Sequence, residues 1–206
     1  MANKNKITYG ISNVHVFPIT STDESGVPTY DTTVIAMPGA TELSLDAEGS
    51  SDPFYADDVV YYQGVVNNGY SGSVTLADIP EDFLTKVMKE IKSEAGTFFE
   101  DASVEPLEFA MAFEFKGDQK KRRHLFYRCK ATRPSVASKT KEDSIEPNTP
   151  ELEIVVMPRL DNNIVKARCE EGDTDYANWY TKPVTPVTSA SAVVANTETA
   201  STKAVK

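Results

Sequence analysis

The chain has 206 residues, of which 40% are apolar and 9% aromatic, and its formal net charge is −10. This composition is ordinary for a globular protein, and no apolar run approaches the ~20 residues of a transmembrane helix, so we expect no membrane partner. The first residues lack the apolar segment of a signal peptide, which favours a protein made and kept in a cytoplasm.

The positive charges are concentrated in one block. Residues 119–141 hold nine of the 21 Lys and Arg and none of the 31 Asp and Glu. Three roles are open for this block: pairing with an acidic surface of another subunit, a solvated strand end, and contact with nucleic acid. Subunit contact is favoured, because the acidic remainder of the chain repels phosphate. The residues expected to make that contact are Lys120, Lys121, Arg122 and Arg123.

The N-terminal part of the chain predicts an arm, a loop and two strands. Residues 1–12 are mostly polar, as in an arm that orders against another surface. Residues 14–19 predict a strand that ends at Pro18. Residues 20–33 predict a long loop, because they are rich in Ser, Thr, Asp, Gly and Pro. Residues 41–47 predict a strand with one apolar face, because apolar and polar residues alternate there.

Residues 54–77 predict a hairpin. Residues 54–66 are rich in aromatic and β-branched side chains and indicate one or two strands, interrupted by Asp57 and Asp58. Asn67, Asn68 and Gly69 favour a turn, after which residues 72–77 resume the strand pattern.

Residues 78–95 predict the one amphipathic helix. Asp78 and Glu81 resemble a capping box, and Gly96 would end the helix. Apolar side chains recur at helical spacing and would pack on a sheet. They are Phe83, Leu84, Val87, Met88 and Ile91.

A second hairpin is predicted over residues 107–134. The first strand alternates large apolar residues with smaller or charged ones, which is typical of a half-buried strand. Gly117 and Asp118 break the pattern before the second strand. On that strand, the predicted inward residues are Leu125, Tyr127, Cys129 and Ala131.

The remaining residues predict a third hairpin and a tail. A polar loop over residues 135–150 precedes strands at 152–157 and 164–169, with a turn at 161–163 between them. Trp179 and its neighbouring tyrosines favour a cap over the core. Residues 184–206 are low in complexity and predict a tail, so the folded domain is expected to span residues 1–183.

Together these elements predict a mainly β (α+β) fold. We expect an antiparallel β-sandwich or partial barrel with one amphipathic helix packed on it, together with an N-terminal arm, long loops and a C-terminal tail. The predicted core consists of Leu43, Leu45, Leu107, Phe109, Met111, Phe113, Phe115, Leu152, Ile154 and Val156.

No motif predicts catalysis or a cofactor. The sequence has no phosphate-binding loop, dinucleotide fingerprint, nucleophile elbow or zinc-protease motif, and only two histidines. Cys129 and Cys169 are expected to be buried reduced thiols, and His124 would point away from Cys129 on the same strand. The acidic turn at 170–175 favours solvated carboxylates over a calcium site. We therefore expect no catalytic, cofactor-binding or metal-binding residue.

Several short segments carry a family resemblance in their order and spacing, over roughly residues 7–183. They are Pro-Gly-Ala at 38–40 followed by Leu43 and Leu45, Phe-Tyr-Ala-Asp-Asp at 54–58, Asn-Gly-Tyr-Ser-Gly at 68–72, Phe-Ala-Met-Ala-Phe-Glu-Phe at 109–115, Tyr-Arg-Cys at 127–129, Arg133-Pro134, and Asn-Trp-Tyr at 178–180. With these segments the chain resembles the major tail proteins, or tail-tube proteins, of long-tailed (siphovirus-type) bacteriophages.

The resemblance implies a structural virion protein with neither enzymatic activity nor a cofactor. Its subunits would form hexameric rings in the host bacterial cytoplasm, and the rings would stack into the tail tube. The implied partners are further copies of the chain, a tape-measure protein in the bore, tail initiator and terminator proteins, and DNA that passes without specific binding. An acidic bore would let DNA slide. The candidate bore residues are Glu42, Asp46, Glu108 and Glu114.

Two other functions remain open from the sequence. A non-catalytic carbohydrate-binding or surface-binding β-sandwich module would use exposed aromatic rings as stacking platforms. The candidate rings are Tyr55, Tyr61, Tyr62, Tyr70 and Trp179. A hydrolase with an acidic site would depend on carboxylates such as Asp57 or Asp173, and only the clustering of acidic residues favours it.

Overall fold

The computed structural model describes residues 7–136, 138 and 148–187, and within them the fold is mainly β with antiparallel strand pairing, as predicted. The elements are β1 (Ile11–Thr22), β2 (Pro28–Tyr30), β3 (Ile35–Ala36), β4 (Ala40–Glu48), β5 (Ser51–Ala56), β6 (Val59–Val65), β7 (Gly69–Leu76), α1 (Glu81–Lys86), β8 (Ile91–Lys92), β9 (Phe98–Phe99), β10 (Phe109–Phe115), β11 (Arg123–Ala131), β12 (Glu151–Val156), β13 (Lys166–Cys169) and the 3-10 helix η1 (Tyr176–Asn178).

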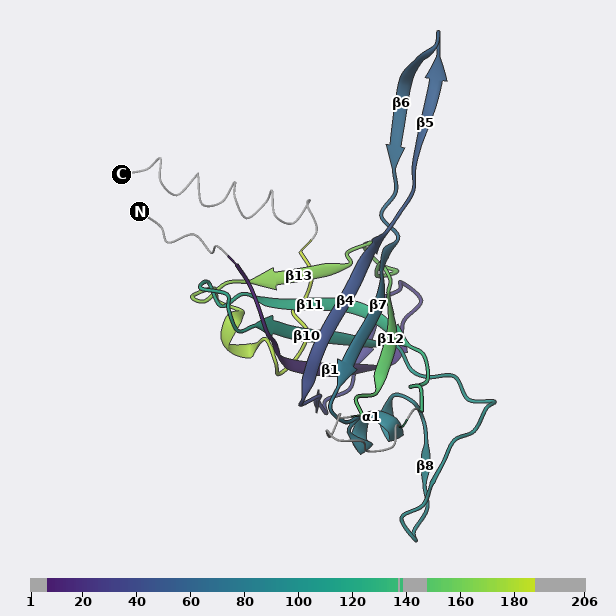
Figure 1. Cartoon of the computed structure of the whole chain (residues 1–206), viewed down its shortest axis with the longest axis vertical. Helices are drawn as coiled ribbons and strands as arrows, with labels where there is room; N and C mark the ends of the chain where they lie inside the picture. Colours follow the sequence, from purple (N-terminus) through teal and green to yellow (C-terminus); the bar gives the residue numbers. More distant parts are fainter. Residues whose placement is uncertain (1–6, 137, 139–147, 188–206) are drawn as a thin grey trace, which may run out of the picture.

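The main sheet folds into two layers. Its strand order is β2-β1-β10-β11-β12-β7-β4, with β13 beside β11 and β3 beside β1. In Figure 1, β4, β7 and β12 cross in front of β1, β10, β11 and β13 at a steep angle. We call these groups the front layer and the back layer. β11 connects them, because it pairs with both β10 and β12.

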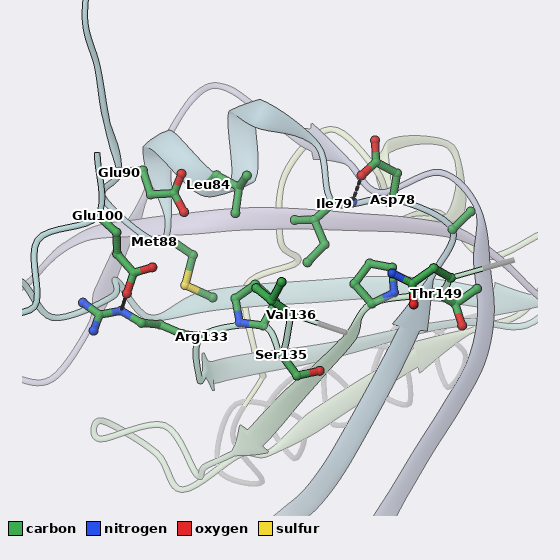
Figure 2. A pocket seen from close by; sticks show the side chains of 14 residues that line it. Asp78, Ile79, Leu84, Met88, Glu90, Glu100, Arg133, Ser135, Val136 and Thr149 are labelled. Atoms are coloured by element: carbon green, nitrogen blue, oxygen red, sulfur yellow. Dashed lines mark hydrogen bonds and ion pairs between the residues drawn. The ribbon is translucent and has the colours of Figure 1, made fainter. Parts of the chain in front are cut away.

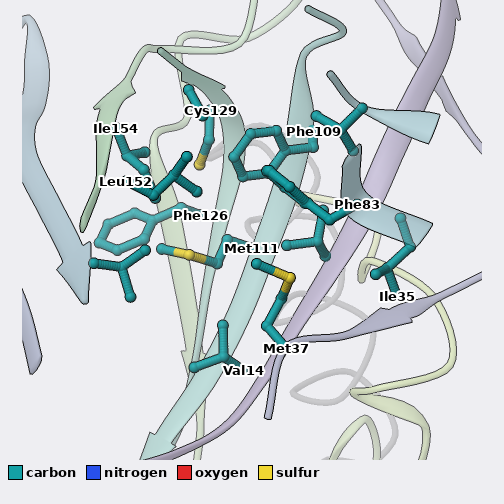
Figure 3. Close-up of a cluster of buried hydrophobic side chains, with 14 of the residues drawn as sticks. Val14, Ile35, Met37, Phe83, Phe109, Met111, Phe126, Cys129, Leu152 and Ile154 are labelled. Atoms are coloured by element: carbon teal, nitrogen blue, oxygen red, sulfur yellow. The ribbon is translucent and has the colours of Figure 1, made fainter. Parts of the chain in front are cut away.

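The main core fills the space between the layers, and Figure 3 shows part of it. Six of the predicted core residues are buried there: Phe109, Met111, Phe113, Leu152, Ile154 and Val156. Leu43, Leu45 and Phe115 are partly buried and pack against the same cluster. Leu107 is half-buried and precedes β10, and its backbone N–H donates to the carbonyl oxygen of Val87 at 2.8 Å.

The β10–β11 hairpin is confirmed, but the predicted alternation of its second strand is wrong. Phe109 lies opposite Cys129 and Met111 lies opposite Phe126. An advance of three residues along β11 therefore matches an advance of two residues along β10. This β-bulge reverses which side chains face inward along β11. Phe126 and Cys129 therefore contact the main core, whereas Leu125 and Tyr127 face the outer side of the back layer.

A second apolar cluster covers the outer side of the back layer. Its buried members are Phe17, Ala110, Ala112, Leu125, Tyr127, Cys169 and Trp179. Trp179 follows η1, is 2% exposed, and donates from Nε1 to the carbonyl oxygen of His124 at 3.2 Å. The middle of β10 is therefore buried on both faces rather than on one. Trp179 therefore covers this second cluster on the outer face of a layer, whereas the prediction placed it as a cap over the core between the layers.

The predicted helix is shorter than its apolar spacing suggested. α1 spans six residues, its N-cap is Pro80, and the N-cap side chain makes no capping hydrogen bond. Lys89 adopts a left-handed φ of 64°, which turns the chain out of the helical path. Ile91 then enters β8, which pairs with β9, and its side chain is 58% exposed. Phe83, Val87 and Met88 are buried, so the inward-facing part of the prediction holds.

The other two hairpins pair differently from the prediction. β5 pairs with β6 across a turn at Asp57 and Asp58, whereas β7 pairs with β4 and β12. β12 and β13 do not form a hairpin with each other, because both pair with β11 at different positions along its length. Strand periodicity fixes which residues face inward, but it does not fix which strands are neighbours.

The predicted limits near the ends need smaller corrections. Pro18 lies inside β1 and does not end it, because its carbonyl oxygen still accepts a hydrogen bond from the Asp31 N–H at 2.8 Å. The predicted loop at 20–33 contains β2. The arm at 1–12, the loop at 135–150 and the tail at 184–206 lie partly outside the described residues. Val184, placed in the tail by the prediction, packs against the second cluster.

Candidate functional site

The β5–β6 hairpin projects from the two layers with its apolar side chains exposed (Figure 1). An isolated two-stranded hairpin is marginal in water, and contiguous apolar patches of this kind are uncommon on monomers. The exposed fractions are 62% for Phe54, 62% for Tyr55, 59% for Val59, 51% for Val60, 76% for Tyr61, 67% for Tyr62 and 79% for Val65. The hairpin therefore has the character of a contact surface.

The exposed area is on the scale of a protein–protein interface. Four aromatic rings, each with about 150–250 Å² of surface when fully exposed, leave roughly 400–700 Å² accessible at these exposures. A standard interface takes about 800 Å² from each partner. With the neighbouring valines, and summed over both faces of the hairpin, the exposed area approaches that value.

The outer side of the front layer is a polar, acidic surface, which we call the acidic face. Strand pairing places Glu42 beside Thr75 and Glu151, and the next row holds Ser44, Ser73 and Glu153. β4, β7 and β12 contain no Lys, Arg or His. The carboxylates of the acidic face are Glu42, Asp46, Glu48, Glu151 and Glu153, and all five residues are exposed.

The structure separates the four predicted bore residues into two pairs. Glu42 and Asp46 lie together on the acidic face. Glu108 and Glu114 lie in or beside β10 in the back layer and form ion pairs with Arg128 and Arg123, at 2.7 and 3.3 Å.

Sequence reasoning did not select Glu151 and Glu153 for the acidic face. Their alternation with Leu152 and Ile154 was visible in the sequence. The sequence did not show that β12 pairs with β7, and this pairing brings Glu151 and Glu153 close to β4.

In the described part of the basic block, the cations pair with carboxylates of the same chain. Lys120 and Lys121 pair with Glu170 and Glu171. Arg122 pairs with Asp118, whose carboxylate is 1% exposed, and Asp118 holds the pKa of Arg122 above its usual value by accepting a hydrogen bond. The role of this block in subunit contact stays a prediction.

Only part of the basic block provides a clean test of that role. Reversal of Arg122 to Glu would place a second negative charge against the buried carboxylate of Asp118 and destabilise the subunit itself. Reversal of Lys120 and Lys121, whose side chains are 55% and 60% exposed, tests the contact without that complication.

Arg123 fixes the C-terminal segment on the back layer. Its guanidinium carbon lies 3.7 Å from the ring centroid of Tyr176 and 4.7 Å from that of Tyr180. Its Nε also lies 3.3 Å from a carboxylate oxygen of Glu114. These contacts hold the segment that carries Trp179 over the second cluster.

A cavity of about 400 Å³ lies beside α1 at the end of the molecule opposite the β5–β6 hairpin (Figure 2). Its wall combines apolar side chains such as Leu84 and Met88 with Arg133, whose Nε lies 2.8 Å from a carboxylate oxygen of Glu100. The described lining holds no histidine or cysteine.

The described residues hold no group of three or more side chains arranged to bind a metal. In the acidic turn, Glu170 and Glu171 are paired with lysines, and the Asp173 carboxylate accepts the Glu170 backbone N–H at 2.7 Å. These contacts use part of the carboxylate oxygens of the turn.

Cys129 and His124 do not form a catalytic pair. The bulge places both on the inner face of β11, contrary to the prediction of opposite faces. Cys129 is fully buried, however, and burial raises the pKa of its thiol far above the usual value, so the thiolate is disfavoured. His124 stacks on Phe113, with ring centroids 5.3 Å apart.

Neither a family model nor a curated protein matches this chain. Among the described residues, no helix has the length and apolar character needed to cross a membrane. The function of the chain is therefore inferred from its own surfaces.

Proposed function

We propose that this chain is a structural subunit that assembles with copies of itself into stacked rings and forms a tube, as a phage tail-tube protein does. The observation that carries the proposal is the projecting β5–β6 hairpin, whose aromatic and valine side chains are more than half exposed. A second copy of the chain supplies the cover that this apolar surface requires. The sequence resemblance to tail-tube proteins supports the same conclusion.

Free strand edges favour continuation of the sheet between copies. Among the described strands, β4 pairs with β7 alone and ends the main sheet, and β5 and β6 pair only with each other. A long exposed edge strand presents unpaired backbone groups to another chain. Pairing of unlike edges is a heterologous contact, which closes into a ring or continues as a filament.

The acidic face supplies the wall of the bore in this proposal. Its five carboxylates have no described basic partner, and the serines and threonines of β7 lie between them. Such a surface repels phosphate, so DNA passes without being held. A tape-measure protein would occupy the bore before ejection, and initiator and terminator proteins would bind the ends of the tube. The assembled particle would be the virion tail.

Electron microscopy of the purified chain tests the proposal. We expect rings or tubes from the wild type and their loss in a Tyr61→Ser, Tyr62→Ser variant, because these side chains are 76% and 67% exposed on the hairpin. A matched control, Leu160→Ser with Val187→Ser, changes two side chains exposed to 61% and 65% elsewhere and should still assemble. If the wild type stays monomeric under every condition, including with tail initiator proteins, the proposal fails.

A carbohydrate-binding or surface-binding module is the second candidate. Tyr55, Tyr61 and Tyr62 favour it, because exposed rings can stack on sugars. Trp179 is buried and Tyr70 is partly buried beside Lys166, so neither is available as an open platform. Glycan binding by the isolated monomer, lost in the Tyr61→Ser, Tyr62→Ser variant, would favour this candidate over self-assembly.

A further inference from the structure

β13 presents two exposed cations beside an open strand edge. Among the described strands it pairs with β11 alone. Lys166 lies opposite Phe126 and Arg168 opposite His124, so both cations share the inner face of the back layer with these two rings. Both are exposed, although Phe126 beside them is buried. We call His124, Lys166 and Arg168 the basic corner.

The positive charge of the basic corner is not balanced within the described chain. No described carboxylate forms an ion pair with Lys166 or Arg168. The Lys166 ammonium group instead donates to the Tyr70 hydroxyl at 2.6 Å. Burial lowers the pKa of His124, and the charges of Arg122, Arg168 and Lys166 lower it further against the opposing effect of Asp118. This corner therefore differs from Lys120, Lys121 and Lys130 of the basic block, which have carboxylate partners.

The β5–β6 hairpin has the opposite charge. Residues 51–65 contain three aspartates and no basic residue. Asp57 and Asp58 form the tip, with left-handed φ values of 51° and 61°. Asparagine or aspartate followed by glycine is favoured in a turn of this geometry, so Asp58 stands where glycine is preferred. Two adjacent aspartates therefore place two carboxylates at the point of the hairpin farthest from the layers, at a local conformational cost.

We propose that the β5–β6 hairpin of one copy binds the basic corner of a second copy, as an added strand along the free edge of β13. The tip carboxylates then face Lys166 and Arg168, and the aromatic rings of the hairpin lie against the sheet beside them. Main-chain hydrogen bonds supply affinity, and the charges set the register. This inference rests on the proposed function and names the receiving surface for its hairpin.

The contact is heterologous, because the hairpin and the basic corner are different surfaces of one chain. Each copy therefore gives one hairpin and receives one. This property makes a mixing experiment decisive, since two charge-reversed variants of the same chain complement each other in both directions.

The experiment uses two variants of the full chain. One carries Asp57→Lys and Asp58→Lys, and the other carries Lys166→Glu and Arg168→Glu. Each variant alone places like charges at the contact, so the protein concentration needed for assembly should rise at least about tenfold. A 1:1 mixture restores opposite charges at every contact and should assemble at close to the wild-type concentration. Electron microscopy and sedimentation give the readout, and thermal unfolding checks each fold.

A third variant controls for the change in net charge. Lys89→Glu with Lys182→Glu alters the net charge by the same amount as the corner variant, at two exposed lysines without a carboxylate partner in the described chain. It should assemble like the wild type. If the wild type assembles and the corner variant does so equally well, or if the mixture does not recover, the proposed contact is wrong although self-assembly stands. If the wild type never assembles, the proposed function fails as well.

Discussion

The outer faces of the two layers differ in composition and in cover. On the back layer, small and apolar side chains such as Ala110, Ala112 and Leu125 lie beneath Trp179 and are buried. On the front layer, carboxylates alternate with serines and threonines, and no described segment covers them. Both faces belong to one continuous sheet. One face is completed within the subunit, whereas the other is open to water, which suits the wall of a bore.

The largest effect is expected at the covered face. Trp179→Ala should lower the free energy of unfolding by about 3–5 kcal/mol, because it removes a large buried side chain and leaves a cavity. Denaturant unfolding measures the change. Tyr61→Ala, at a ring that is 76% exposed, is the matched control and should leave stability almost unchanged. Equal losses in the two variants would contradict the assignment of buried and exposed rings.

A smaller loss of stability is expected at the edge of the back layer. Arg122→Ala should cost about 1.5–3 kcal/mol, because it removes a charged hydrogen-bond partner from the buried carboxylate of Asp118. Lys121→Ala breaks an exposed pair with Glu171 and should change the free energy of unfolding by less than about 1 kcal/mol. Denaturant unfolding of both variants compares the two pairs directly, and a larger loss from Lys121→Ala would refute the comparison.

The next effect on the free energy of unfolding is expected only at alkaline pH. Burial raises the pKa of Tyr127 from 10.0 to about 12. Between those values the unfolded chain loses the phenol proton while the folded chain keeps it, so the free energy of unfolding should fall as pH rises. Tyr127→Phe should flatten this decline and leave stability at pH 7 close to that of the wild type. An unchanged slope in unfolding experiments from pH 9 to 12 would show that Tyr127 does not contribute.

The smallest effect on stability is expected at the acidic face. Glu151→Gln with Glu153→Gln should change the free energy of unfolding by less than about 0.5 kcal/mol, because both side chains are exposed and neither forms an ion pair in the described chain. Lysine at the same two positions should make assembled tubes retain DNA in a salt-dependent manner. Retention by the lysine variant that equals that of the wild type would contradict a bore lined by this face.

The sequence predicted the structure correctly where a single residue pattern determines which side chains are buried. Alternation in residues 109–115 and 152–156 identified buried side chains, because inward and outward positions repeat every two residues. It also identified Glu42 and Asp46 as members of a polar strand face.

The sequence did not predict features that depend on contacts between distant segments, such as strand pairing. The bulge opposite Phe109 reversed the facing of Leu125 and Tyr127, and the shared pairing of β12 and β13 with β11 replaced a predicted hairpin. The same limitation hid Glu151 and Glu153 as neighbours of Glu42. Apolar spacing also overestimated α1, because Val87 and Met88 are buried just after the helix ends.

The most direct test of the central claim is a cryo-electron microscopy map of the assembled protein, at a resolution that separates the two layers. We expect stacked rings whose bore is lined by the outer side of β4, β7 and β12, with Glu42 and Asp46 facing the channel and the β5–β6 hairpin in contact with a neighbouring copy. A bore lined by the back layer, or an assembly in which the hairpin extends freely into solvent, would contradict it.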